Sequence, residues 1–142
     1  MRYAIKFEYI GTGFKGSQFQ PDERTVQGEL DKAFSIYFNE PVKIIPSGRT
    51  DAGVHALGQV ANFKTNSNIP VEKIPIAINT KVKKSIVIKS AEEVDERFHS
   101  RYNCKQKTYR YVINNSKQGT AIYRDLECHI PMELNIEEMQ KA

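Results

Sequence analysis

Ten consecutive residues, from Ser47 to Ala56, bring together the side chains in this sequence that are best suited to chemistry. They supply two hydroxyls, a guanidinium, a carboxylate and an imidazole, from Ser47, Thr50, Arg49, Asp51 and His55. Gly48 and Gly53 favour turns, and short apolar runs flank the segment, so we expect a loop between two strands. Loops on a rigid scaffold often carry function, and a carboxylate there can act as nucleophile or general base. Asp51 is therefore the candidate catalytic residue.

The same segment has simpler interpretations that the residue types alone leave open. Asp and Gly are ordinary turn formers, so Asp51 could hydrogen-bond its own backbone in a β-turn. Two-residue spacing in an extended segment would put Arg49 on the same side as Asp51. Arg49 could then contact phosphate, take the place that a flipped base vacates, or hold Asp51 ionised. The simpler alternative is a surface ion pair worth ~0–1 kcal/mol. For His55 we favour a hydrogen bond that fixes the loop.

A second cluster lies between Arg97 and Lys117, where the sequence has six basic residues and no Asp or Glu. The run from Lys107 to Tyr111 interleaves basic and aromatic residues. Such a pattern suits a base-stacking platform centred on Tyr109, since stacking contributes about 1–3 kcal/mol per base. For an isolated tyrosine the alternative is core packing, and for the charges it is a solvated face.

Composition narrows the class of protein. The 142 residues suffice for one domain with a core, and the net charge of +4 with a pI near 9.0 is compatible with a nucleic-acid partner. Cys104 and Cys128 lack metal-ligand spacing, so we expect two reduced thiols in the cytoplasm. The sequence contains neither a secretory signal nor an apolar run near the ~18 residues of a membrane span, so no membrane partner is expected.

Two periodicities define the elements that must position these groups. Residues 3–9 alternate apolar and polar, which predicts a strand with one buried face. A helix is predicted next, with Thr25 as its N-cap and Pro41 beyond its end. Its apolar stripe consists of Val26, Leu30, Ala33, Phe34 and Tyr37. Gly28 weakens this helix by about 1 kcal/mol relative to Ala, and we expect a close approach of another backbone to explain it.

The order of the remaining elements predicts the fold. We expect strands at 42–45, 57–63, 85–89 and 107–113, a helix at 75–80, and another helix beginning at Asn135. The first six elements match a ferredoxin-like split βαβ unit. The predicted fold is therefore α+β, an antiparallel sheet with helices on one face and the other face, carrying tyrosines or basic residues, open to a ligand. Residues 1–142 are treated as a single domain.

The literal segment from Arg49 to Ala56 closely resembles the catalytic signature of the tRNA pseudouridine synthase A family. Three further segments, 9–20, 98–102 and 107–111, resemble motifs of the same family in the same order. Two features depart from it: Ser17 stands where the family usually has Trp, and residues 82–86 replace a Leu-Pro-x-Asp-Ile element. The resemblance covers nearly the whole chain, which looks like the N-terminal half of such an enzyme without its C-terminal half.

The resemblance implies an isomerase that converts uridine to pseudouridine in the anticodon stem-loop of tRNA, with no metal and no cofactor. It assigns Asp51 as nucleophile or base. It assigns RNA or substrate contacts to Arg49, Phe98, His99, Ser100, Arg101, Tyr102, Lys107, Tyr109 and Arg110. The resemblance also implies the pseudouridine synthase fold, a cytoplasmic homodimer at full length, and weak or no activity for the 142-residue chain alone. The rival hypothesis is a non-catalytic RNA-binding module that does not need Asp51.

Overall fold

The computed structural model describes residues 1–142. By its internal contacts the chain divides into two compact units, Met1–Lys105 (unit 1) and Gln106–Ala142 (unit 2), and each is described by itself. The assignment of residues 1–142 to a single domain therefore stays a prediction. None of the helices combines the length and apolar character that crossing a membrane requires.

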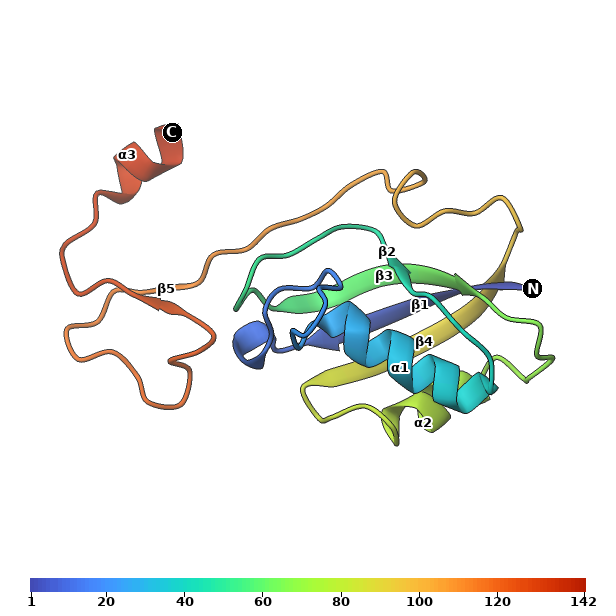
Figure 1. The fold of residues 1–142 in the computed structure, drawn as a ribbon. Coiled ribbons are helices and arrows are strands. Elements are labelled where there is room, and N and C mark those ends of the chain that lie inside the picture. Colours follow the sequence, from blue (N-terminus) through green and yellow to red (C-terminus); the bar gives the residue numbers. More distant parts are fainter. The chain divides into compact units, whose positions relative to one another are not determined.

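Unit 1 is a four-stranded antiparallel sheet with two helices (Figure 1). Its elements are β1 (Arg2–Tyr9), the 3-10 turn η1 (Gly11–Gly13), α1 (Val26–Phe38), β2 (Ile45–Pro46), β3 (Ala56–Lys64), α2 (Lys73–Asn79) and β4 (Ile86–Val94). The strands lie in the order β2-β3-β1-β4, and every neighbouring pair is antiparallel. This βαββαβ arrangement confirms the predicted fold class.

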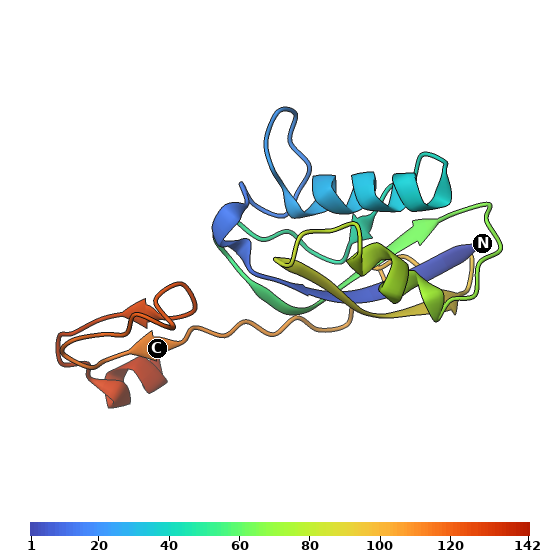
Figure 2. The same cartoon turned by 90° about the horizontal axis from the view of Figure 1, so that it is seen from below.

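The core of unit 1 lies between the sheet and the two helices, which cover the same face (Figure 2). Alternation along β1 turns Tyr3, Ile5, Phe7 and Tyr9 into this core, as predicted. The helices contribute Val26, Leu30, Ala33, Phe34 and Phe38 from α1, and Ile74 and Ile78 from α2. Burying a large apolar side chain contributes about 1.5–3 kcal/mol, so this layer holds the helices on the sheet.

Both ends of α1 have identifiable causes. The Thr25 side chain accepts a hydrogen bond from the Gly28 N–H at 3.2 Å, which confirms the predicted N-cap. At the other end Asn39 adopts φ 53°, a left-handed C-cap. The explanation expected for Gly28 is wrong. A Cβ at Gly28 would meet the Thr25 hydroxyl at 3.0 Å and the ring of Phe19 at 3.5 Å, so side chains, not a second backbone, crowd this position.

The strand predicted at 42–45 is wrong for most of its length, since β2 contains only Ile45 and Pro46. Side chains of α1 take the backbone N–H groups that a sheet neighbour would otherwise bind. The Val42 N–H donates to Ser35 Oγ at 2.9 Å, and the Ile44 N–H donates to Asp31 Oδ1 at 2.8 Å. The segment before β2 is therefore fastened to the helix and not to the sheet.

Unit 2 has little regular structure: β5 (Ile113–Asn114), β6 (Cys128–His129) and α3 (Ile136–Lys141). Asn135 caps α3 by accepting the Glu138 N–H at 3.1 Å, which confirms the predicted helix start. The strand predicted at 107–113 is wrong, because only Ile113 is paired, with Cys128 of β6. Alternation of side chains is not sufficient for a strand, which also needs a partner backbone, and residues 107–111 have none.

Candidate functional site

Asp51 lies in the loop between β2 and β3, residues 47–55, which we call the signature loop. Its side chain is exposed and makes no hydrogen bond or ion pair. The turn is closed by main chain instead, with the Val54 N–H donating to the Asp51 carbonyl oxygen at 3.2 Å and Gly53 at φ 82°. The interpretation in which the carboxylate bonds its own backbone is therefore wrong, and the carboxylate faces solvent.

The residue next to Asp51 is held by the loop that follows β1. The Thr50 N–H donates to Ser17 Oγ at 2.7 Å, and the Ser17 N–H donates to the Thr50 carbonyl oxygen at 3.0 Å. The hydroxyls of Thr50 and Tyr9 lie 2.7 Å apart in a further hydrogen bond. Ser17 is buried, so loss of its hydroxyl would leave the Thr50 N–H unsatisfied. Sequence reasoning treated Ser17 only as a departure from a motif.

The signature loop is also fixed at its far end and at its base. His55 Nδ1 accepts the Gly11 N–H at 2.9 Å, which confirms the loop-fixing role expected for this histidine. Gly11 sits so close that a Cβ there would overlap the Val54 carbonyl group, 2.7 Å from its carbon atom. Gln59 of β3 donates to the Gly48 carbonyl oxygen at 3.0 Å. The backbone that carries Asp51 is thus bonded on several sides while its carboxylate stays free.

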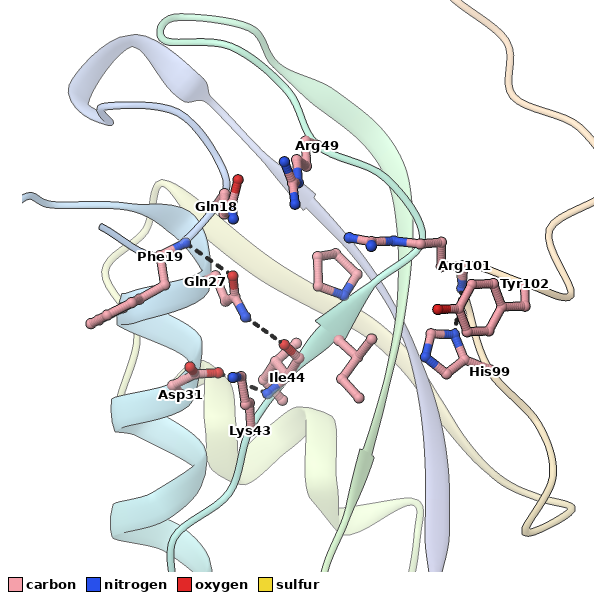
Figure 3. Close-up of a pocket in the computed structure, with 12 residues that line it drawn as sticks. Gln18, Phe19, Gln27, Asp31, Lys43, Ile44, Arg49, His99, Arg101 and Tyr102 are labelled. Atoms are coloured by element: carbon pink, nitrogen blue, oxygen red, sulfur yellow. Dashed lines mark hydrogen bonds between the residues drawn. The ribbon is translucent and has the colours of Figure 1, made fainter. Parts of the chain in front are cut away.

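Arg49 does not pair with Asp51, so the surface ion-pair interpretation is wrong: its exposed side chain makes no ion pair or hydrogen bond. It lines a cleft of about 490 Å³ beside β2, together with His99, Arg101 and Tyr102 (Figure 3). The structure therefore brings four of the predicted RNA-binding residues to one place. Asp51 is not among the residues that line the cleft. The remaining residues that line the cleft are Gln18, Phe19, Gln27, Asp31, Lys43, Ile44, Ile45 and Pro46.

The turn from Phe98 to Tyr102 is fastened to the sheet mainly through Ser100. This buried serine donates its N–H to Asn62 Oδ1 at 2.8 Å and its hydroxyl to the Ile45 carbonyl oxygen at 2.5 Å. The carbonyl of the half-buried Phe98 accepts from the Arg2 guanidinium.

Two of the three aromatic rings of this turn, those of His99 and Tyr102, stack on each other. The His99 and Tyr102 ring centroids lie 4.2 Å apart, and the Arg101 N–H donates to His99 Nδ1 at 3.2 Å. The RNA contacts assigned to Phe98, His99, Ser100, Arg101 and Tyr102 stay predictions. Within the turn, Ser100 acts as the structural anchor.

One carboxyl group in the cleft has a displaced pKa. Burial raises the pKa of Asp31 to about 6, and the hydrogen bond from Ile44 and the charge of Lys43 oppose that rise. Sequence reasoning missed Asp31, Lys43 and Gln27, because only the fold brings α1 beside the segment before β2. No group of three or more His, Cys, Asp or Glu side chains is arranged to hold a metal ion.

Lys107, Tyr109 and Arg110 belong to unit 2, where their side chains are exposed. Tyr109 is 70% exposed and Tyr111 89%, so neither is packed into a core. The core-packing alternative for Tyr109 is therefore wrong. Its stacking on a base, and the RNA contacts of Lys107 and Arg110, stay predictions.

Comparison with known proteins identifies the family. A family model described as tRNA pseudouridine synthase matches residues 5–103, which include the signature loop and the turn from Phe98 to Tyr102. The tRNA pseudouridine synthases A of Ruminiclostridium cellulolyticum and Caldicellulosiruptor saccharolyticus are each 49% identical to the chain over 138 residues. These alignments cover 97% of this chain, and 56% and 57% of the two relatives. The enzyme of the same name from Brevibacillus brevis is 44% identical over 134 residues, which is 94% of this chain and 55% of the relative.

The chain thus spans about half the length of the curated relatives that it matches. The family match itself extends over well more than half of the chain and contains both the loop and the cleft described above. The chain belongs to the tRNA pseudouridine synthase family.

Proposed function

We propose that this chain forms part of an enzyme that isomerises uridine to pseudouridine in the anticodon stem-loop of tRNA, with Asp51 as nucleophile or general base. One observation carries the proposal: Asp51 presents an unpartnered, solvent-facing carboxylate on a loop whose backbone is bonded from several sides. Such a group is available to a substrate and already positioned for it. Family membership supplies the substrate class.

The reaction sets clear requirements on the site. The bond from uracil N1 to the sugar breaks, the base rotates, and C5 bonds to the same sugar carbon. C5 loses its hydrogen and N1 gains a proton, so atoms and oxidation state balance without a co-reactant. Asp51 would either attack the sugar carbon or remove a sugar proton. In both cases its carboxylate must be held in position, and the hydrogen bonds at Thr50 and His55 fix the backbone that carries it.

Access to the uridine requires that its base leave the RNA stack. Extrusion costs a few kcal/mol, which stacking on Tyr109 at about 1–3 kcal/mol and phosphate contacts would offset. Arg49, two residues before Asp51, would contact phosphate or fill the space that the base vacates. Phosphate contacts imply an affinity for RNA that falls steeply with salt. A homodimer of the full-length enzyme is part of the same proposal.

The test compares Asp51→Asn with Asp22→Asn, a change of the same kind at an exposed loop residue. Pseudouridine formation in an anticodon-arm RNA would be measured for the chain alone. It would also be measured for a hybrid in which this chain replaces the matched part of the Ruminiclostridium cellulolyticum relative. We expect Asp51→Asn to lower the rate by about 10²–10⁴-fold or more, with RNA affinity within about twofold. Asp22→Asn should change neither, and an active Asp51→Asn hybrid would sink the assignment.

The second candidate is a non-catalytic RNA-binding module. It is favoured by the position of the cleft, which gathers cationic residues but is not lined by Asp51. It predicts salt-sensitive RNA binding with no isomerisation by the chain or by the hybrid. Turnover by the hybrid that depends on Asp51 would exclude it.

A further inference from the structure

Two tyrosines of β1 face the same core, and one of them reaches the signature loop. Tyr3 and Tyr9 are buried to nearly the same degree, with 2% and 3% of their surfaces exposed. The hydroxyl of Tyr3 has the Met1 sulfur as its partner at 4.0 Å, and a thioether is a weak acceptor. The hydroxyl of Tyr9 lies 2.7 Å from Thr50 Oγ1, one residue before Asp51. This pair of hydroxyls connects the core of the sheet to the loop that carries Asp51.

The sheet is irregular at the end of β1, where Tyr9 lies. Against β3, Phe7 pairs with Gln59. Tyr9 then pairs with Ala56, so β3 advances three residues while β1 advances two. A second shift of register, against β4, falls next to Phe7. Such bulges re-aim side chains and are common next to active sites. Beyond both shifts the backbone of Tyr9 is still paired on two sides, with Ala56 and with Ile86 of β4.

Thr50 is held through all three of its polar groups. Its N–H donates to Ser17 Oγ at 2.7 Å, and its carbonyl accepts from the Ser17 N–H at 3.0 Å. The bond to Tyr9 acts on the side chain instead. Threonine is branched at Cβ, so fixing its hydroxyl selects one χ1 rotamer, and the allowed rotamer is coupled to φ and ψ of the same residue. The ψ angle of Thr50 sets the direction in which the chain enters Asp51.

We propose that Tyr9 is a positioning residue for the reaction: its hydroxyl fixes the side chain of Thr50 and thereby the direction of the Cα–Cβ bond of Asp51. The inference rests on the proposed function of Asp51 and extends it to a residue of the core. Because Tyr9 is buried, it acts on the substrate only through Thr50. A displacement of about 1 Å at a reacting group can cost about 10²-fold in rate. Loss of one hydroxyl, with both bonds to Ser17 still in place, should cost about 3- to 30-fold.

A purely structural role for the same bond makes a different prediction. A buried tyrosine hydroxyl needs a hydrogen-bond partner, and Thr50 would then serve only to satisfy it. Stability would fall without Tyr9, but catalysis would not. Two controls separate the roles. Tyr3→Phe repeats the chemical change on the same strand and face, and Ile74→Val lowers stability by trimming a fully buried residue of α2.

The experiment measures pseudouridine formation in an anticodon-arm RNA by the hybrid with the Ruminiclostridium cellulolyticum relative, well below the unfolding temperature of every variant. We expect Tyr9→Phe to lower kcat about 3- to 30-fold with KM within about twofold, because the buried ring makes no contact with RNA. Thr50→Val should have the same effect, and Thr50→Ser, which keeps the hydroxyl, should retain most of the rate. Tyr3→Phe and Ile74→Val should keep full kcat. The double variant Tyr9→Phe/Thr50→Val should be no slower than its slower single variant, because both changes remove one bond.

A second measurement follows the loop directly in the whole chain. The bond to Ser17 protects the Thr50 N–H from hydrogen exchange. Tyr9→Phe should speed this exchange about 3- to 30-fold, and Tyr3→Phe should leave it unchanged. Full kcat in Tyr9→Phe, multiplied losses in the double variant, or unchanged exchange at Thr50 would overturn the role of Tyr9 and leave that of Asp51 standing. A hybrid that is inactive without any substitution would overturn both.

Discussion

The signature loop and the segment from Lys107 to Tyr111 both carry residues assigned to the reaction, and they are held in opposite ways. The loop is hydrogen-bonded to Ser17, Tyr9 and Gly11, which all lie in or after β1. The segment makes no hydrogen bond within its own unit, and its tyrosines are exposed. The backbone that carries the Asp51 carboxylate is therefore fixed by its own unit, whereas the segment that carries Tyr109 is not held by hydrogen bonds of its unit.

The contrast between a fixed loop and an exposed segment fits the two proposed roles, catalysis by a carboxylate and stacking by an aromatic ring. A carboxylate that attacks or removes a proton must stand within a few tenths of an ångström of its target, and a rigid backbone supplies that precision. A ring that stacks on a base tolerates several positions, because every base has a flat apolar face. The predictions below test first the rigidity of the loop, then the freedom of the segment, and last the charge of the cleft.

The largest effect should come from Gly11→Ala. A Cβ at this position overlaps the Val54 carbonyl, so either the signature loop or η1 must move. We expect a loss of at least about 1–3 kcal/mol in the free energy of unfolding, together with loss of turnover. Gly58→Ala is the matched control, since its Cβ would meet only the flexible end of Lys6, and it should stay within about 0.5 kcal/mol. Urea denaturation measures the free energy of unfolding of both variants. Equal losses in Gly11→Ala and Gly58→Ala would contradict the role of Gly11 in fixing the signature loop.

Ser17→Ala removes the acceptor of the Thr50 N–H without adding bulk. An unsatisfied buried N–H costs about 1–3 kcal/mol, so unfolding should become easier by that amount. In the active hybrid kcat should fall while KM stays within about twofold, because Ser17 positions the loop and does not touch the substrate. Ser90→Ala, an exposed serine on β4, serves as control. A Ser17→Ala hybrid that lost stability but kept full kcat would show that the bond is structural only.

Substitution of the tyrosines in the segment from Lys107 to Tyr111 should change RNA binding and leave stability unchanged. Tyr109→Leu should weaken RNA binding about 5- to 150-fold, the equivalent of about 1–3 kcal/mol of stacking, and Tyr109→Phe should retain most of the affinity. The unfolding midpoint should not change, because the ring is exposed. Tyr111→Leu decides between the two rings: a larger loss there than at Tyr109 would transfer the stacking role to Tyr111.

The smallest effect concerns Asp31. Its pKa of about 6 in the folded chain lies above the ~3.9 of an unfolded aspartate, so the folded state binds the proton more tightly. The stability that this group contributes is therefore complete below about pH 4 and is lost as pH rises through 6. Asp31→Asn should stabilise the fold by less than about 1 kcal/mol at pH 7.5, after allowance for partial exposure, and by nothing near pH 4. Urea denaturation at the two pH values checks this, with Asp22→Asn as control.

Much of unit 1 could be predicted because its elements obey local rules. Period-two alternation located β1, the helical stripe and Thr25 located α1, and the order of elements led to the ferredoxin-like sheet. The errors arose where distant residues decide the outcome. Nothing local indicates that α1 side chains claim the backbone of Val42 and Ile44, which shortens β2.

The candidate site also contains residues that local sequence reveals and residues that only the fold brings together. Its chemically distinctive residues, above all Asp51 and Arg49, could be chosen from the sequence. The residues that hold or complement them could not, because Ser17 reaches Thr50 and Lys43 reaches the cleft only after the chain has folded. Tyr109 shows a third case, in which the alternating pattern is genuine but residues 107–111 have no partner strand.

The central place of β1 in the sheet has a consequence for synthesis of the chain. Arg2 pairs with Lys64 on one side and with Val94 on the other, so the first strand made has to wait for the last strand of its sheet. Contacts of such long sequence separation slow folding, because loop-closure entropy is lost before they form. Ser17 and Gly11 follow β1 and bond to Thr50 and His55, so the loop that carries Asp51 can be fixed once the chain has been made as far as His55. On the ribosome, these bonds can therefore form before β4, the last strand of the sheet, has been made.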